Sequence, residues 1–238
     1  GTTSIAPRRR EYIIAATFFR AEVDMGSNAK RSHLWSIIVV AVVLSAYAFG
    51  AAINAMNARE AGVIYKRDEG VALECVVTWD ASGLDRLMDL AVDMEVPLTF
   101  FMTASFAAEH PERVAQMLEK GFDVGLLCGD AETLRAQADR MRAFGVSLTH
   151  VMPADGADAS AVDKAASELG LSTVLCTFEL RNNTTDPNAL IQKVGESTFD
   201  GAIIRFQPAK TTIDAFSGMI ETLRHMGLTL KSLSGGNE

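Results

Sequence analysis

Cysteine is scarce in this sequence, with three cysteines in 238 residues. Cys75, Cys128 and Cys176 are too few and too widely spaced to form a disulfide framework or a zinc knuckle. Each lies in or beside an apolar run, so we expect it to be buried as a small apolar side chain. The sequence also lacks a phosphate loop and a recognisable arrangement of nucleophile, histidine and acid. These absences give no support to a disulfide-stabilised module, a nucleotide-binding enzyme or a triad hydrolase.

Positive charge is also in deficit, because 22 Lys and Arg face 30 Asp and Glu and give a net charge of −8. Residues 1–33 carry about +3 and the sequence after residue 58 carries about −11. Such a domain repels a phosphate backbone, so nucleic acid is not an expected partner. Hydrophobic residues make up 48% of the chain, and its length suffices for one domain with a sizeable core.

Charge is absent from one long stretch, residues 34–53. About 20 apolar residues suffice to span a bilayer, so we expect a transmembrane anchor over residues 34–56. Lys30 and Arg31 precede this stretch. The positive-inside rule then predicts a cytoplasmic segment at 1–33 and a single-pass protein of the cell membrane, with its C-terminal domain on the outer side.

A cleaved signal peptide is the alternative interpretation of the same stretch. Met25 would be its start, and the small residues AYA at 46–48 resemble a cleavage site. The apolar run is long for a signal peptide, which favours the uncleaved anchor.

Beyond residue 62, short β-rich runs alternate with helical runs. The expected strands are 71–77, 97–102, 122–127, 149–152, 172–178, 202–206 and 228–233. The expected helices are 84–94, 107–120, 131–144, 159–169, 188–194 and 213–226. This alternation predicts a parallel sheet with right-handed crossovers. The local pattern leaves open whether the strands close into a barrel or form an open sheet.

Two early segments carry a resemblance to a known family. VALECVVTWDASGLDRLMDLAVDMEVPLTFF at 71–101 and FAAEHPERVAQMLEKGFDVG at 106–125 resemble the polysaccharide deacetylase (NodB-homology) family, in its sporulation-type branch. Later segments fit the same branch, so the resemblance covers residues 62–234. It implies an α/β fold, a distorted seven-stranded (β/α) barrel with its site at the C-terminal mouth. With the expected anchor, the barrel would be preceded by one N-terminal transmembrane helix.

The resemblance also implies a metal-dependent site, but this sequence lacks the residues that form it. The family's functional positions are occupied by Val76, Leu127, Ala131, Met152, Asn182 and Gln207. In the family, an Asp stands at the first of these positions, two metal-binding His at the next two and a general-acid His at the last. An alternative alignment keeps Asp80 as the motif Asp, but it breaks the fit at 71–73.

The replaced positions decide the expected function. Deacetylation in the family uses a divalent metal that polarises the carbonyl and activates water, together with an acid and a base. The replacements Val76, Leu127 and Ala131 offer no metal donor. We therefore expect a catalytically inactive protein of the cell envelope without a cofactor or metal, which binds cell-wall glycan or envelope proteins, with a role in sporulation. The alternative is a deacetylase of N-acetylglucosamine or peptidoglycan with residual or altered activity.

Other polar residues follow the expected strands and are candidates for a relocated site. They are Asp80, Asp130, His150, Asp155, Glu179 and Arg181. No two of them share metal-ligand spacing on one element, and polar loops are common at a barrel mouth. We expect solvated loop residues here rather than a second site.

Two charged residues are expected inside the barrel. Side chains alternate along a strand, so Glu74 shares a face with Val76, and Arg205 shares a face with Gln207. Because an unpaired buried charge is very costly, we expect Glu74 and Arg205 to form an ion pair beneath the lost metal site.

Overall fold

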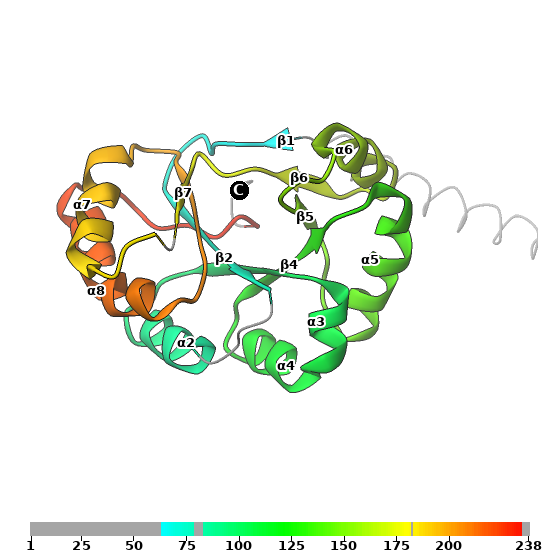
Figure 1. The fold of residues 1–238 in the computed structure, drawn as a ribbon, viewed down its shortest axis with the longest axis horizontal. Helices are drawn as coiled ribbons and strands as arrows, with labels where there is room; N and C mark the ends of the chain where they lie inside the picture. Colours follow the sequence, from blue (N-terminus) through cyan, green and yellow to red (C-terminus); the bar gives the residue numbers. More distant parts are fainter. Residues whose placement is uncertain (1–62, 79–82, 182, 235–238) are drawn as a thin grey trace, which may run out of the picture. The chain divides into compact units, whose positions relative to one another are not determined.

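Eight parallel strands form one curled sheet in the order β1-β6-β5-β4-β3-β2-β8-β7 (Figure 1). The computed structural model describes residues 63–78, 83–181 and 183–234, all within the second of two compact units, 55–238. The strands are β1 (Val63–Ile64), β2 (Ala72–Val77), β3 (Leu98–Met102), β4 (Asp123–Cys128), β5 (His150–Pro153), β6 (Ser172–Val174), β7 (Phe178–Leu180) and β8 (Ile203–Phe206). The predicted parallel α/β fold is therefore confirmed.

Helices cover the outer side of this sheet, as Figure 1 shows. They are α2 (Leu84–Asp93), α3 (Ala104–Glu109), α4 (Pro111–Glu119), the 3-10 helix η1 (Ala131–Thr133), α5 (Leu134–Ala143), α6 (Ala159–Glu168), α7 (Pro187–Ser197) and α8 (Lys210–His225). The single helix predicted at 107–120 is two helices, α3 and α4, which meet at His110. Pro111 explains the break, because its ring disfavours a helical conformation at the residue before it.

The run at 172–178 differs most from its prediction as one strand. Its first half, β6, pairs with β5 and β1, whereas β7 pairs with β8 at the opposite edge of the sheet. Residues 175–177 cross between them: the Leu175 amide donates to Ile64 O at 2.7 Å and the Thr177 amide donates to Ile203 O at 2.8 Å. The crossing segment thus contacts both edges of the sheet and helps to close the barrel.

The other strand differences lie at the ends of the domain. β1 is an additional strand that the sequence does not predict, and the division of 172–178 into β6 and β7 adds another, so the described sheet has eight strands. The strand expected at 228–233 is reduced to one bridge between Val71 and Leu230. The Val71 amide donates to Thr229 O, and the Lys231 amide donates to Val71 O. This C-terminal segment therefore lies along the start of β2, and Leu233 is buried inside the barrel.

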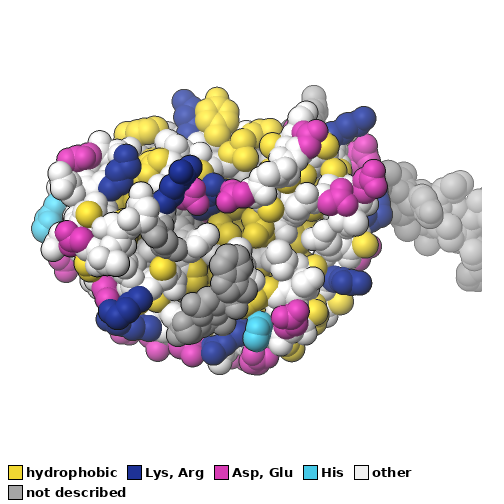
Figure 2. Space-filling model, in the orientation of Figure 1, with side chains coloured by type: hydrophobic (Ala, Val, Ile, Leu, Met, Phe, Trp, Pro, Cys, Tyr) yellow, Lys and Arg dark blue, Asp and Glu magenta, His cyan; other side chains and the backbone are white. Residues whose placement is uncertain are grey.

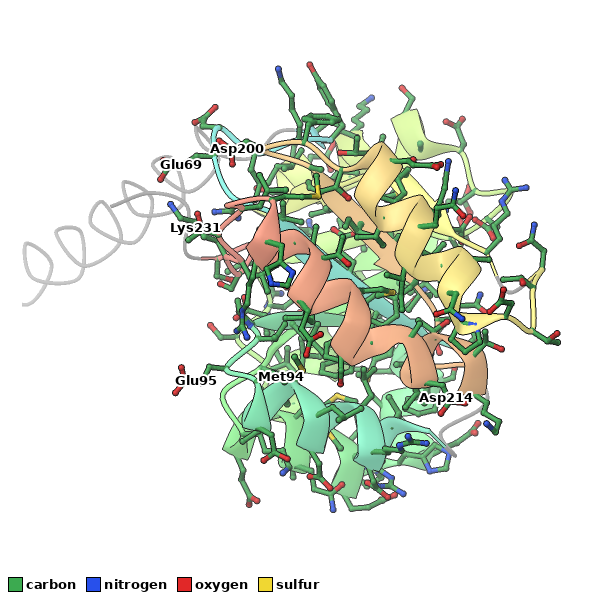
Figure 3. The ribbon with its side chains drawn as sticks, turned by 90° about the vertical axis from the view of Figure 1, so that its left-hand side faces the viewer. Glu69, Met94, Glu95, Asp200, Asp214 and Lys231 are labelled. Atoms are coloured by element: carbon green, nitrogen blue, oxygen red, sulfur yellow. The ribbon has the colours of Figure 1, made fainter. Side chains whose placement is uncertain are left out.

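Side-chain contacts also stabilise the end of the domain where the C-terminal segment lies along β2 (Figure 3). Lys231 forms an ion pair with Glu69, and Asp200 accepts a hydrogen bond from the Gly70 amide at 2.6 Å. Below them in the same view, Arg224 of α8 donates to Met94 O at the end of α2. These contacts join segments that lie far apart in the sequence.

No helix within the described ranges is long and apolar enough to cross a membrane. The longest of them, α8, has 16 residues and buries one face against the sheet while the other meets solvent. This finding overturns the predicted single-pass location in the cell membrane. The run at 34–56, on which that prediction depended, lies outside the described residues.

Alternation along the strands separates two apolar cores. A large core lies between the sheet and the helices, and a smaller one fills the interior of the barrel. On β3, Phe100 enters the outer core, where its ring packs edge-on against Phe122 at 5.3 Å, whereas Phe101 enters the inner core. Successive residues of one strand thus serve opposite faces of the sheet.

Position 125 must be glycine because the ring of Phe101 packs directly against it inside the barrel. A Cβ atom built on Gly125 would overlap three atoms of that ring. We expect Gly125→Ala to lower the free energy of unfolding by about 1–3 kcal/mol, as overpacking usually does. Gly129→Ala is the matched control, because a Cβ there meets nothing within 4 Å. Urea unfolding of the two variants checks this, and equal stabilities would show that the Phe101 ring moves aside freely.

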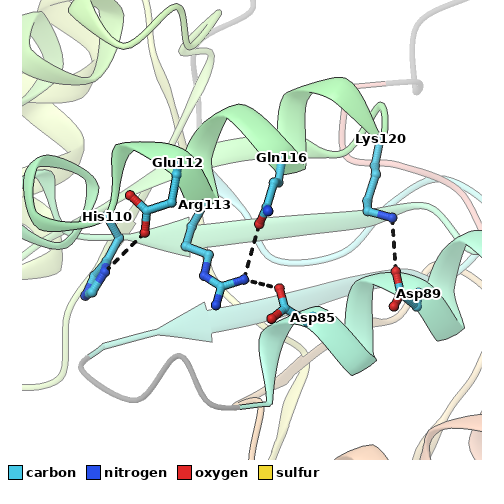
Figure 4. Close-up of polar contacts among 7 residues, drawn as sticks. All are labelled: Asp85, Asp89, His110, Glu112, Arg113, Gln116 and Lys120. Atoms are coloured by element: carbon cyan, nitrogen blue, oxygen red, sulfur yellow. Dashed lines mark hydrogen bonds and ion pairs between the residues drawn. The ribbon is translucent and has the colours of Figure 1, made fainter.

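Exposed ion pairs connect α2 and α4 (Figure 4). Lys120 Nζ lies 3.0 Å from Asp89 Oδ1, and Arg113 pairs with Asp85 while donating to Gln116. Because exposed pairs are weak, a double-mutant cycle on Lys120→Ala and Asp89→Ala should give a coupling energy of about 0.2–1 kcal/mol. A coupling above about 2 kcal/mol would show that these pairs hold the two helices together.

Candidate functional site

The centre of the barrel is apolar where the resemblance expects a metal. Val76, Leu127 and Met152 lie in one buried cluster, on β2, β4 and β5. The full cluster is Ala72, Val76, Phe101, Leu127, Met152, Val174, Ile203 and Leu233. The structure therefore brings three of the six replaced positions together.

The other replaced positions do not join this cluster. Ala131 begins η1 and packs against the outer core. Gln207 directly follows β8 and is half-buried. Asn182 lies outside the described residues, as does the candidate Asp80.

Charged side chains gather around Arg205 at the edge of the apolar centre. Arg205 Nη2 lies 3.4 Å from Glu179 Oε2 and 3.7 Å from Asp155 Oδ1. Arg181 Nε lies 3.5 Å from the same Glu179 oxygen. Arg205 Nη1 also approaches the Met152 sulfur at 3.9 Å, which places the guanidinium directly beside the apolar cluster. We call Asp155, Glu179, Arg181 and Arg205 the rim cluster.

The rim cluster is charged but not uniformly exposed. The side chains of Asp155 and Arg181 are 87% and 78% exposed, whereas those of Glu179 and Arg205 are 22% and 18% exposed. Figure 2 shows apolar side chains lying between basic and acidic ones on one face of the domain. Such a surface offers hydrogen-bond donors and acceptors next to apolar contact area.

Two further candidates lie apart from this cluster. Asp130 caps η1: its carboxylate accepts a hydrogen bond from the Glu132 amide at 3.0 Å. His150 is buried at the amino end of β5, where Thr149 Oγ1 lies 2.9 Å from its Nδ1. Burial lowers the pKa of His150, while the nearby Asp123 raises it. His150 thus lies towards the end of the barrel opposite the mouth and does not belong to the rim cluster.

Glu74 is fully buried inside the barrel, as predicted, but the expected ion pair with Arg205 is not formed. The two residues are register partners on β2 and β8. Nevertheless, neither carboxylate oxygen of Glu74 has a hydrogen-bond partner in the described structure, and the ion pairs of Arg205 go to Glu179 and Asp155. The reason is that β7 places Glu179 beside Arg205 on its other side.

Burial raises the pKa of the Glu74 carboxyl to about 8, and the positive charge of Arg205 only partly opposes this shift. The carboxyl group is therefore mostly protonated at neutral pH. A neutral acid can remain in an apolar interior where a carboxylate could not.

Comparison with known proteins yields a match in fold. No model of a protein family matches the chain. Among solved structures, the family 4 pseudoenzyme BA3943 from Bacillus anthracis superposes with a TM-score of 0.65 at 20% identity, over 73% of this chain and 68% of that one. PdaA from Bacillus subtilis, a family 4 carbohydrate esterase, gives 0.65 at 18% identity, over 73% and 84%.

A third structure agrees with these two. A family 4 carbohydrate esterase from Streptomyces lividans, in complex with acetate, gives a TM-score of 0.62 at 18% identity, over 71% of this chain and 95% of that one. The chain has the fold of the family 4 carbohydrate esterases. The predicted resemblance to polysaccharide deacetylases is thereby confirmed at the level of the fold.

On this esterase fold, the described residues offer no obvious metal centre. No group of three or more His, Cys, Asp or Glu side chains among them is placed to hold a metal ion. Val76 and Leu127 cannot ligate a metal, and a single Met thioether suits soft metals rather than those that activate water. Among the described residues, the arrangement offers hydrogen bonding and apolar contact at the mouth.

Sequence reasoning missed Thr99 in the interior of the esterase fold, and it expected Cys176 to be buried, whereas Cys176 is half-buried. Thr99 is buried next to Glu74 in the register of β2 and β3. Cys176 packs against the inner cluster, and burial raises the pKa of its thiol. Strand alternation could have found Thr99, because it lies two residues before the inward Phe101. Cys176 lies in the crossing segment 175–177, for which no periodic signal exists.

Proposed function

We propose that this protein is a catalytically inactive relative of the polysaccharide deacetylases that binds cell-wall glycan at the mouth of its barrel. The observation that carries the proposal is the buried cluster of Val76, Leu127 and Met152 at the centre of the fold. Amide hydrolysis by a metal-bound water needs about three oxygen or nitrogen donors at such a centre. The chain supplies apolar side chains there instead.

The solved structures with this fold include a protein without enzymatic activity, which supports the proposal. BA3943 is described as a pseudoenzyme, and a mutant of it is described as having restored enzymatic activity. Another neighbour is a peptidoglycan N-acetylglucosamine deacetylase. For the present protein we therefore propose N-acetylglucosamine-containing glycan as the ligand and the cell envelope, as in sporulation, as the setting.

The rim cluster supplies the groups that would recognise a sugar. Arg181 and Asp155 are exposed, and both belong to a cluster of donors and acceptors beside apolar surface. Hydroxyl and acetamido groups require such polar partners, and sugar rings also present apolar faces.

Titration calorimetry with N-acetylglucosamine oligomers tests this proposal. We expect binding to the wild-type protein and at least about threefold weaker binding to Arg181→Ala, the loss of one charge-assisted hydrogen bond. Arg140→Ala removes an exposed arginine from α5 and serves as the matched control. Absence of binding, or equal weakening in both variants, would contradict glycan binding at the rim cluster.

A deacetylase with residual or altered activity is the second candidate. The observation in its favour is the gathering of Glu74, Glu179 and Asp155 around one arginine, which places ionisable groups beside the apolar centre. Release of acetate from the bound glycan distinguishes the two functions, because a binding protein releases none.

A further inference from the structure

Three neighbouring residues inside the barrel bury polar atoms for which the described residues provide no hydrogen-bond partner. They are both carboxyl oxygens of Glu74, the Thr99 hydroxyl and Arg205 Nε. Thr99 and Arg205 flank Glu74 in register on the two adjacent strands, β3 and β8. An unpaired donor, Arg205 Nε, therefore lies on the strand next to an unpaired acceptor. Buried groups of this kind are normally paired, so their separation requires an explanation.

The guanidinium of Arg205 lies between two alternative sets of acidic partners. Its Nη2 lies near Glu179 and Asp155 in the rim cluster, while its Nε is buried and has no hydrogen-bond partner among the described residues. Asp155 is largely exposed, and the exposed ion pair that it makes contributes little free energy. The outer position of Arg205 is therefore held mainly by Glu179, while Glu74 is the acidic register partner of Arg205 on the adjacent strand.

The protonation state of Glu74 determines which set of partners is favoured. A protonated Glu74 needs no counter-ion, so Arg205 can remain with Glu179 and Asp155. An ionised Glu74 without a partner would be strongly destabilised in this interior. The pKa of Glu74, about 8, allows ionisation under mildly alkaline conditions.

The surroundings of Glu74 leave Arg205 as its counter-ion. Glu179 on β7 is acidic, and Cys176 in the crossing segment has a pKa raised by burial, so it is uncharged. On the other side, Thr99 does not titrate, and Asp123 on β4, its register partner, is also acidic. Arg205 is thus the one cation among these neighbours.

We propose that Glu74 and Arg205 form a proton-controlled switch at the mouth of the barrel. While Glu74 is protonated, Arg205 bridges Glu179 and Asp155. When Glu74 loses its proton, the guanidinium turns inward to the new carboxylate and releases both rim carboxylates. The switch changes the charge pattern of the rim cluster without any change in the backbone, and it does not depend on whether the rim binds glycan.

NMR spectroscopy of the full chain tests the switch, with ¹³C-labelled glutamate and ¹⁵N-labelled arginine side chains followed from about pH 6 to about pH 10. The Glu74 carboxyl signal is assigned by its loss in Glu74→Gln, and the Arg205 Nε signal by its loss in Arg205→Lys. We expect both signals to titrate with one common midpoint near pH 8.

The variants separate the switch from independent titrations. In Glu74→Gln the Arg205 signal should stay constant across the range, and Glu74→Met provides a second neutral variant if Gln perturbs folding. In Arg205→Met the Glu74 midpoint should rise by about one pH unit or more, because its counter-ion is gone. Glu179→Gln removes the outer partner of Arg205 and should lower the common midpoint. Glu168→Gln, at an exposed position of α6, is the matched control and should keep it. The proposal is overturned if the Arg205 signal does not change while Glu74 titrates, or if it titrates in Glu74→Gln as it does in the wild type. It is also overturned if the Glu74 signal does not titrate.

Discussion

The free energy of unfolding is expected to fall by about 1.4 kcal/mol per pH unit between about pH 4.5 and about pH 8, and Glu74→Gln should remove this fall. The ordinary pKa of a glutamate, 4.5, applies to the unfolded chain, whereas burial raises the pKa of Glu74 to about 8 in the folded protein. Between these values the folded state keeps a proton that the unfolded state has lost. A rise in pH therefore favours unfolding.

The effect is confined to that window. Below the lower value both states are protonated, and above the higher value both are ionised, so the contribution of Glu74 is constant on either side. Across the window, the loss amounts to roughly 3–5 kcal/mol. Urea unfolding at several pH values, followed by circular dichroism, measures it as the difference between wild type and Glu74→Gln. Glu168→Gln, at an exposed position of α6, is the control and should keep the wild-type slope. Parallel slopes for wild type and Glu74→Gln would show that Glu74 is not a buried neutral acid.

The second large effect is expected at Phe101. Its ring is fully buried at the centre of the inner core, where it covers Gly125. Phe101→Ala should lower the free energy of unfolding by about 3–5 kcal/mol, because it leaves a cavity among side chains that cannot collapse fully. Phe199→Ala is the control, since Phe199 is 49% exposed and should lose less than about 1 kcal/mol.

A double-mutant cycle between Phe101 and Gly125 tests whether the two residues are energetically coupled. In a Phe101→Leu background the smaller side chain leaves room for a Cβ, so Gly125→Ala should become nearly neutral. The double variant should therefore be about 1–2 kcal/mol more stable than the sum of the two single effects predicts. Strictly additive effects would mean that the interior tolerates the methyl group by another route.

The sequence predicted which way the strand residues face better than it predicted their partners. Alternation along β2 and β8 correctly placed Glu74 and Arg205 inside the barrel, because a strand that is buried on both faces still keeps its period of two. The expected pair failed because 172–178 was taken as one strand. In the structure only 172–174 form β6, 175–177 cross the barrel, and β7 begins at Phe178, which sets Glu179 beside Arg205. An apolar run carries no sign of where the chain leaves one sheet edge for the other.

The candidate site was likewise predictable only in part. Motif spacing correctly identified Leu127 as a residue of the barrel centre. The same spacing could not show that Ala131, four residues later, begins a 3-10 helix and packs against the outer core. Local spacing fixes positions along the chain, whereas the face that a loop residue presents depends on the tertiary path of the backbone.

The most direct test of the central claim is acetate release measured together with bound metal on one sample. The purified protein is incubated with zinc, cobalt, nickel or manganese, freed of excess metal, analysed for its metal content and then mixed with N-acetylglucosamine oligomers or peptidoglycan. An active deacetylase assayed in parallel shows that the substrates and the assay work. An apolar centre formed by Val76, Leu127 and Met152 predicts no stoichiometric metal and no acetate above the protein-free control. Metal-dependent acetate release that a chelator abolishes, and that added metal restores, would contradict it.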